Sequence, residues 1–89
     1  MIYTLHINKE EPGLYTARAL DGRAEVAEFQ ATTISGAIRD CAVGTLPSVD
    51  GFHIWYGHVS VGTTSIGAMR HDAETLAQRL VSLHSQFAD

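Results

Sequence analysis

The chain has 89 residues, 45% of them hydrophobic and 18% charged, and its formal net charge at pH 7 is −4. This length and composition predict one globular domain over residues 1–89 and leave little room for a deep catalytic cleft. The six Lys and Arg residues are scattered, so the chain is a poor match for the phosphate backbone of a nucleic acid. No apolar run reaches the ~18 residues of a membrane helix, and residues 1–7 lack the basic start of a signal peptide, which predicts a soluble, cytoplasmic protein.

Three strands are predicted in the first third of the chain, at residues 2–8, 14–20 and 23–30. Asp21-Gly22 lies between the second and third strands and predicts a tight hairpin turn, because such turns need the positive φ angle that glycine adopts easily. In the third strand the alternation is broken between Val26 and Phe29, which have opposite parity. A bulge or a bend is therefore expected in this strand.

Two helices are predicted from apolar side chains that recur every three or four residues. The first helix spans roughly residues 33–43, begins at a Thr-Thr pair that supplies an N-cap, and stops at Gly44. A loop follows over residues 45–51. The second helix begins after Asp72, whose carboxylate is suited to cap its first turn.

Residues 52–61 are the most strongly strand-forming segment, and residues 65–69 are a weaker candidate for a short fifth strand. The predicted order is therefore β-β-β-α-β-(β)-α. Three strands joined by short loops form an antiparallel meander, and a crossover helix leads to the fourth strand. We predict an α+β fold with two layers, an antiparallel sheet with two helices on one of its faces.

The segment 52–61 carries apolar side chains on both faces of the predicted strand. One face carries Phe52, Ile54, Tyr56 and His58, and the other carries His53, Trp55, Gly57, Val59 and Val61. A strand that helices cover on one side only should be polar on its other side. Two explanations remain open: a local element of the same chain, such as residues 62–69, covers the second face, or another protein does.

Few residues are arranged for catalysis or for metal binding. His53 and His58 point to opposite faces of one predicted strand, and the single cysteine, Cys41, is expected to be a buried apolar residue. The element order resembles the start of a ribonuclease-H-like fold, but the first strand has no acidic residue for Mg²⁺. Glu25 and Glu28 have opposite parity, so they cannot share an ion unless a bulge realigns them. We therefore predict no enzyme activity, no catalytic residue, no metal and no cofactor.

Residues 3–40, which include the stretches YTLHINKEEPGLYTARAL and EFQATTISGAIRD, resemble the HicB-like antitoxin family. The shared features are a short first strand, an acidic turn, two further strands and a helix that starts at threonine. The resemblance implies a partial ribonuclease-H-like sheet without catalysis, which dimerises or binds a partner through the sheet. The family's usual Pro-Gly-Cys segment is absent after the second strand, and no ribbon-helix-helix or helix-turn-helix segment follows. The resemblance therefore does not imply direct nucleic-acid binding by this chain.

We interpret the chain as a non-catalytic protein-interaction module that inhibits or neutralises a partner, as an antitoxin, an immunity protein or a phage-encoded inhibitor does. Its acidity suits a partner protein that is basic or associated with nucleic acid. Aromatic side chains on an open sheet are common energetic centres of interfaces, so the expected contact residues are His53, Trp55, Tyr56 and His58. Two alternatives are a small ligand- or metal-binding enzyme subunit that uses histidines in a dimer cleft, and a structural homodimer module.

Overall fold

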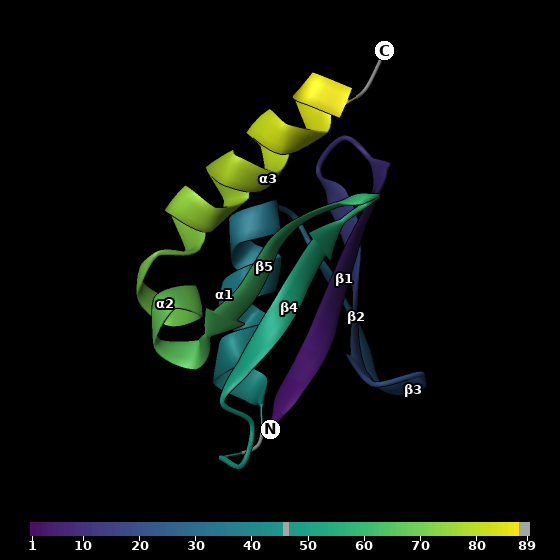
Figure 1. The fold of residues 1–89 in the computed structure, drawn as a ribbon. Coiled ribbons are helices and arrows are strands. Elements are labelled where there is room, and N and C mark those ends of the chain that lie inside the picture. The colour runs from purple at the N-terminus through teal and green to yellow at the C-terminus, as the bar shows by residue number, and fades with distance from the viewer. Residues whose placement is uncertain (46, 88–89) are drawn as a thin grey trace.

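The computed structural model describes residues 1–45 and 47–87 and contains one five-stranded sheet with helices packed against it (Figure 1). In chain order the elements are β1 (Ile2–Glu11), β2 (Leu14–Asp21), β3 (Ala24–Ala31), α1 (Ile34–Gly44), β4 (Gly51–Tyr56), β5 (Val59–Ser65), α2 (Ile66–His71) and α3 (Ala73–Phe87). The predicted α+β fold, with helices packed on a sheet, is confirmed. None of the helices in the two described stretches combines the length and the hydropathy needed to cross a membrane.

The strands are ordered β3-β2-β1-β4-β5 across the sheet, so the first strand of the chain lies at its centre. β1 pairs antiparallel with β2 but parallel with β4, whereas β2/β3 and β4/β5 are antiparallel pairs. The expectation of a wholly antiparallel sheet is therefore wrong for the pair β1/β4. The reason is α1, which carries the chain back along the sheet so that β4 starts at the same end as β1 (Figure 1).

The hairpin between β2 and β3 confirms the turn predicted from its glycine. Gly22 has a φ angle of 63° and Arg23 follows without a positive φ angle, which is typical of a type II′ turn. A register shift beside Leu20 leaves Val26 as an extra residue on β3, so the predicted irregularity is a bulge. Val26 is 51% exposed and, together with Phe29, lines a hollow between β3 and α1.

Two predictions about the second half of the chain are wrong in detail. The segment 52–61 is a hairpin and not one strand, because β4 ends before Gly57, which has a φ angle of 59°, and β5 then runs back. Residues 65–69 do not form a strand, because Ser65 caps α2 by accepting a hydrogen bond from the backbone N–H of Ala68 at 3.2 Å. Hydrophobic periodicity did not reveal the turn after β4 or the start of α2, because a single glycine or a single capping serine is sufficient to cause each of them.

The positions of α1 and α3 agree with the two predicted helices. The side-chain oxygen of Thr33 caps α1 by accepting a hydrogen bond from the backbone N–H of Gly36 at 2.9 Å. Gly44 is the last residue of α1, and α3 begins directly after Asp72. α2 is a short additional helix between β5 and α3. The predicted loop at residues 45–51 includes residue 46, which lies outside the described residues.

One hydrophobic core fills the space between the sheet and the helices. Its largest fully buried side chains are Leu5, Ile7, Ile38, Phe52, Ile54, Met69 and Leu80. Leu5 and Ile54 lie opposite each other in the parallel pair at the centre of the sheet. Full burial of an aliphatic side chain contributes about 1.5–3 kcal/mol. The core therefore strongly favours the β1/β4 register.

Gly51 is buried at the start of β4, where a Cβ atom would overlap the carbonyl group of Thr64 on β5. We predict that Gly51→Ala lowers the free energy of unfolding by about 1–3 kcal/mol, because the new methyl group would overlap a backbone oxygen of the β4/β5 pair. Gly44→Ala is the control, since the space around Gly44 is open. The free energy of unfolding of this variant should rise, or change by less than about 0.5 kcal/mol. Urea unfolding followed by circular dichroism measures both, and equal stabilities would contradict this account.

Candidate functional site

The sheet face that points away from the helices carries the stacked side chains of His53 and Trp55. Both residues belong to β4, where they alternate with Phe52, Ile54 and Tyr56 on the covered face. The centroids of the two rings lie 5.4 Å apart, with an angle of 29° between the ring planes. The helices lie on the opposite face of the sheet (Figure 1), so these half-buried rings remain partly open to solvent.

His6 of β1 lies beside Trp55, because the parallel register sets these two residues opposite each other. The Nε2 atom of His6 donates a hydrogen bond to the carbonyl oxygen of Gly57 at 3.0 Å, since a carbonyl oxygen can only accept. Its Nδ1 atom then accepts from the side-chain amide of Asn8 at 3.5 Å. The two bonds hold the ring in one orientation and one tautomer. We refer to His6, His53 and Trp55 as the open-face cluster.

The four residues predicted to contact a partner do not share one face. His53 and Trp55 lie together on the open face, whereas Tyr56 is only 8% exposed and packs on the covered face. Burial, and next the neighbouring hydroxyl of Tyr15, raise the pKa of Tyr56. Tyr56 therefore belongs to the core, and His58 lies exposed in the turn between β4 and β5.

A shallow hollow of about 610 Å³ connects Trp55 with the turn that holds His58. The other residues that line it are Val59, Ser60 and Leu83. The hydroxyl of Ser60 donates to the carbonyl oxygen of Ile54 at 2.8 Å and accepts from the backbone N–H of Gly62 at 2.9 Å. These bonds stabilise the irregular part of the β4/β5 pair, so the hollow has a fixed wall at the end of the sheet.

The turn after β4 accounts for most of the apolar side chains that segment 52–61 was expected to expose. Val59 lies opposite Tyr56 once the chain has reversed, and it is 6% exposed as part of the core. Residues 62–69 continue β5 and enter α2, so they are part of the sheet edge and the helical layer. Trp55 is the large apolar side chain that this segment leaves on the open face. The open face of β4 therefore carries one large aromatic ring with histidine neighbours, and not a continuous apolar surface.

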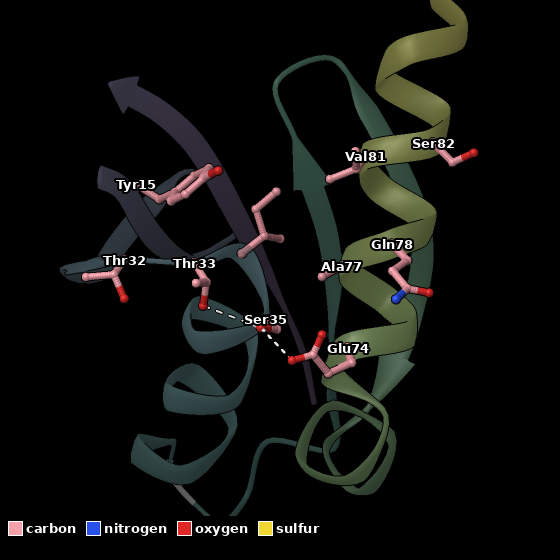
Figure 2. Close-up of a pocket in the computed structure, with 10 residues that line it drawn as sticks. Tyr15, Thr32, Thr33, Ser35, Glu74, Ala77, Gln78, Val81 and Ser82 are labelled. Carbon is pink, nitrogen blue, oxygen red and sulfur yellow. Dashed lines mark hydrogen bonds between the residues drawn. The ribbon is translucent and has the colours of Figure 1, made fainter. Parts of the chain in front are cut away.

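A second concavity, of about 470 Å³, lies between the N-terminal end of α1 and α3 (Figure 2). Tyr15 of β2 and Val81 of α3 border it from two sides (Figure 2). The hydroxyl of Ser35 donates to Oε1 of Glu74 at 3.5 Å and lies 3.4 Å from the hydroxyl oxygen of Thr33. The residues that line this concavity include no histidine or cysteine, so they form no histidine-activated nucleophile.

The remaining histidines and the cysteine are the other candidates for metal ligands and nucleophiles. Within residues 1–45 and 47–87, no group of three or more His, Cys, Asp or Glu side chains is placed to hold a metal ion. His58 and His84 form a pair whose ring centroids are 5.4 Å apart. Burial raises the pKa of the Cys41 thiol to about 12, so this thiol stays protonated and poorly reactive near neutral pH.

No protein-family model, curated protein or solved structure matches this chain. His6 is a candidate residue that the sequence analysis missed. The alternation in residues 2–8 is sufficient to place His6 on the face opposite Leu5 and Ile7, but its position beside Trp55 depends on a parallel pairing that was not predicted.

Substitutions of the adjacent residues Trp55 and Tyr56 should separate the open face from the core. We predict that Tyr56→Ala lowers the free energy of unfolding by about 3–5 kcal/mol, because it empties a buried ring position packed against His84. Trp55→Ala should cost only about 1 kcal/mol, since its ring is partly solvated and loses mainly cross-strand contacts. Urea unfolding followed by circular dichroism measures both values, and a larger loss for Trp55→Ala would contradict the assignment.

The buried thiol of Cys41 gives a chemical test of the core. Since burial raises the pKa of this thiol from 9.0 to about 12, we predict that a thiolate-selective reagent does not label the folded protein near neutral pH. Labelling should instead follow unfolding and become faster as urea is added. Deprotonation favours the unfolded chain, so the stability that depends on the neutral thiol is fully present below pH 9.0 and is lost as the pH rises toward 12. Rapid, complete labelling of the native protein would show that Cys41 is not in the core.

Proposed function

We propose that the protein is a non-catalytic interaction module that inhibits or neutralises a partner protein by binding it with the open face of its sheet. The observation that carries this proposal is the open-face cluster, in which the stacked His53 and Trp55 lie beside the hydrogen-bonded His6. Aromatic side chains that are already held in position lose little conformational entropy when a partner binds. They also bury a large area, which is why tryptophan is common at the energetic centre of interfaces.

The charge of the chain favours a basic partner. The net charge is −4, and β3 brings Glu25 and Glu28 to the open side of the sheet. Arg18 offsets part of this charge, because its Nε atom lies 3.4 Å from a carboxylate oxygen of Glu25. Opposite potentials speed the association of two proteins and orient their encounter. A basic cytoplasmic protein, or a basic subunit of a nucleic-acid-associated complex, is therefore the proposed partner.

The resemblance of residues 3–40 to the HicB-like antitoxin family supports the same role, since it implies that a partner binds through the sheet. Inhibition of this kind needs no chemistry from the inhibitor. A partner is inactivated when its functional surface is covered, provided that the lifetime of the complex exceeds the time that the partner needs to act. The side chains that border the open face therefore need to supply affinity and specificity, and not a reacting group.

The His58–His84 pair supports a second candidate function, a metal- or ligand-binding subunit that uses histidines. The ring centroids lie 5.4 Å apart, and His58 is exposed whereas His84 is half-buried, so the pair lies at the surface beside the turn after β4. Two ligands are too few for a stable zinc site, so a second copy would have to supply more. Thermal stabilisation by Zn²⁺ that His58→Ala abolishes would favour this candidate over the interaction module.

The proposed function is tested by comparing three forms of the chain against the protein that the wild type captures from its native host. We predict that Trp55→Ala weakens binding by at least about 2 kcal/mol, or roughly 30-fold, as expected for a central aromatic residue. Isothermal titration calorimetry with the purified partner measures this change, and circular dichroism checks that the fold is kept. Gln78→Ala, an exposed position on α3, is the matched control and should bind like the wild type. Unchanged affinity for Trp55→Ala would exclude the open-face cluster as the binding site.

A further inference from the structure

The two edges of the sheet differ in how open they are to a further strand. β5, at one edge, packs against α3, has a register shift in its pairing with β4, and contains Gly62 with a φ angle of 83°. β3, at the other edge, has no buried residue among its eight. An edge strand presents unpaired N–H and C=O groups that readily accept another strand. β3 is therefore the more accessible edge.

The part of β3 beyond its bulge is regular and apolar on one side. Residues 27–31 pair with β2 without interruption, whereas the bulge at Val26 lies nearer the hairpin turn. On the covered side this segment carries Ala27, Phe29 and Ala31. A hollow of about 360 Å³ lies beside it, lined in part by Phe29, Cys41 and Phe52. A second apolar strand at this edge would remove exposed apolar surface from water.

The charge pattern of the segment indicates which strand would fit. Glu28 is the one charged residue among residues 27–31. If two identical segments pair antiparallel about Phe29, each Glu28 lies opposite Gln30 of the second copy. The amide of Gln30 can then donate to the carboxylate of Glu28 twice by symmetry. A pairing centred on Glu28 itself would oppose two carboxylates, which is destabilising. The segment is therefore complementary to its own copy in the register centred on Phe29.

We propose that two copies of this chain associate edge to edge through residues 27–31 of β3, antiparallel and centred on Phe29. The two sheets then form one continuous sheet, with the helices of both copies on one side. Both open-face clusters lie on the other side, so the dimer carries two copies of Trp55 that face the same way. No residue of the open-face cluster belongs to β3, so different substitutions test this proposal and the proposed binding site.

Sedimentation equilibrium of the full chain measures the dissociation constant of the dimer. Gln30→Glu should weaken dimerisation about tenfold, because it opposes two glutamates at each of two symmetry-related contacts. Gln30→Lys should strengthen it, because each new lysine lies opposite Glu28 of the second copy. The double variant with Glu28→Gln and Gln30→Glu exchanges the two groups and should return the dissociation constant to near the wild-type value.

Two controls separate this interface from other surfaces. Thr63→Glu adds the same charge at an exposed position of β5 and should leave the dimer unchanged, as should Trp55→Ala. A chain that stays monomeric at every attainable concentration overturns the proposal. The proposal is also overturned if Gln30→Glu leaves the dissociation constant unchanged, or if the double variant does not restore it. Dissociation of the dimer by Trp55→Ala would overturn it as well. Circular dichroism of each variant excludes loss of the fold as the cause of a change.

Discussion

The parallel pairing of β1 with β4 is the constraint on which both the core and the open face depend. It sets Leu5 opposite Ile54 on the covered side and His6 opposite Trp55 on the open side. One register determines both sets of neighbours, because side chains alternate between the two faces of a sheet. A slip of one residue would bury His6 and expose Leu5. The free energy that holds the core together therefore also holds the open-face cluster in position.

Contacts at both ends of this strand pair maintain its register. At one end the backbone N–H of Gly57 donates to the carbonyl oxygen of Ile7 at 3.0 Å, and the carbonyl oxygen of Gly57 accepts from His6 at 3.0 Å. At the other end the backbone N–H of Asp50 donates to the carbonyl oxygen of Met1 at 2.8 Å, and the carboxylate of Asp50 pairs with the terminal ammonium group. His6 thus both belongs to the candidate site and ties β1 to the turn after β4.

Features that depend on a few neighbouring residues could be predicted from the sequence. The hairpin at Gly22 and the bulge at Val26 each follow from residues close together in the chain. The cap at Thr33 is equally local, because it needs only a hydroxyl three residues before a free backbone N–H. Propensity and periodicity describe this range of the chain well, and the α+β fold follows from the order of the elements.

Features that depend on contacts between distant residues were not predictable in the same way. The turn at Gly57 lies inside an apolar run, so the run was interpreted as one strand with two apolar faces. The predicted contact residues were therefore taken from both faces of that strand, and Tyr56 lies on the face that the core covers. The packing of the helices determines whether Trp55 or Tyr56 points into the core. The position of His6 beside Trp55 depends on a crossover through α1, which brings together residues that are far apart in the chain.

The two proposed surfaces use different chemistry on a very small molecule. The described chain exposes 5216 Å², and a standard interface covers about 800 Å² of each partner, so both surfaces can be occupied at once. Edge pairing at β3 uses main-chain groups and tolerates many sequences, so Glu28 and Gln30 would determine its selectivity. The proposed recognition at the open face uses Trp55 and its two histidine neighbours. One copy of the chain therefore offers only a small set of contacts. A dimer doubles that set, and a partner with two equivalent sites would meet the second cluster at a high effective concentration. Such avidity is a physical route by which a few aromatic contacts would support the proposed inhibition.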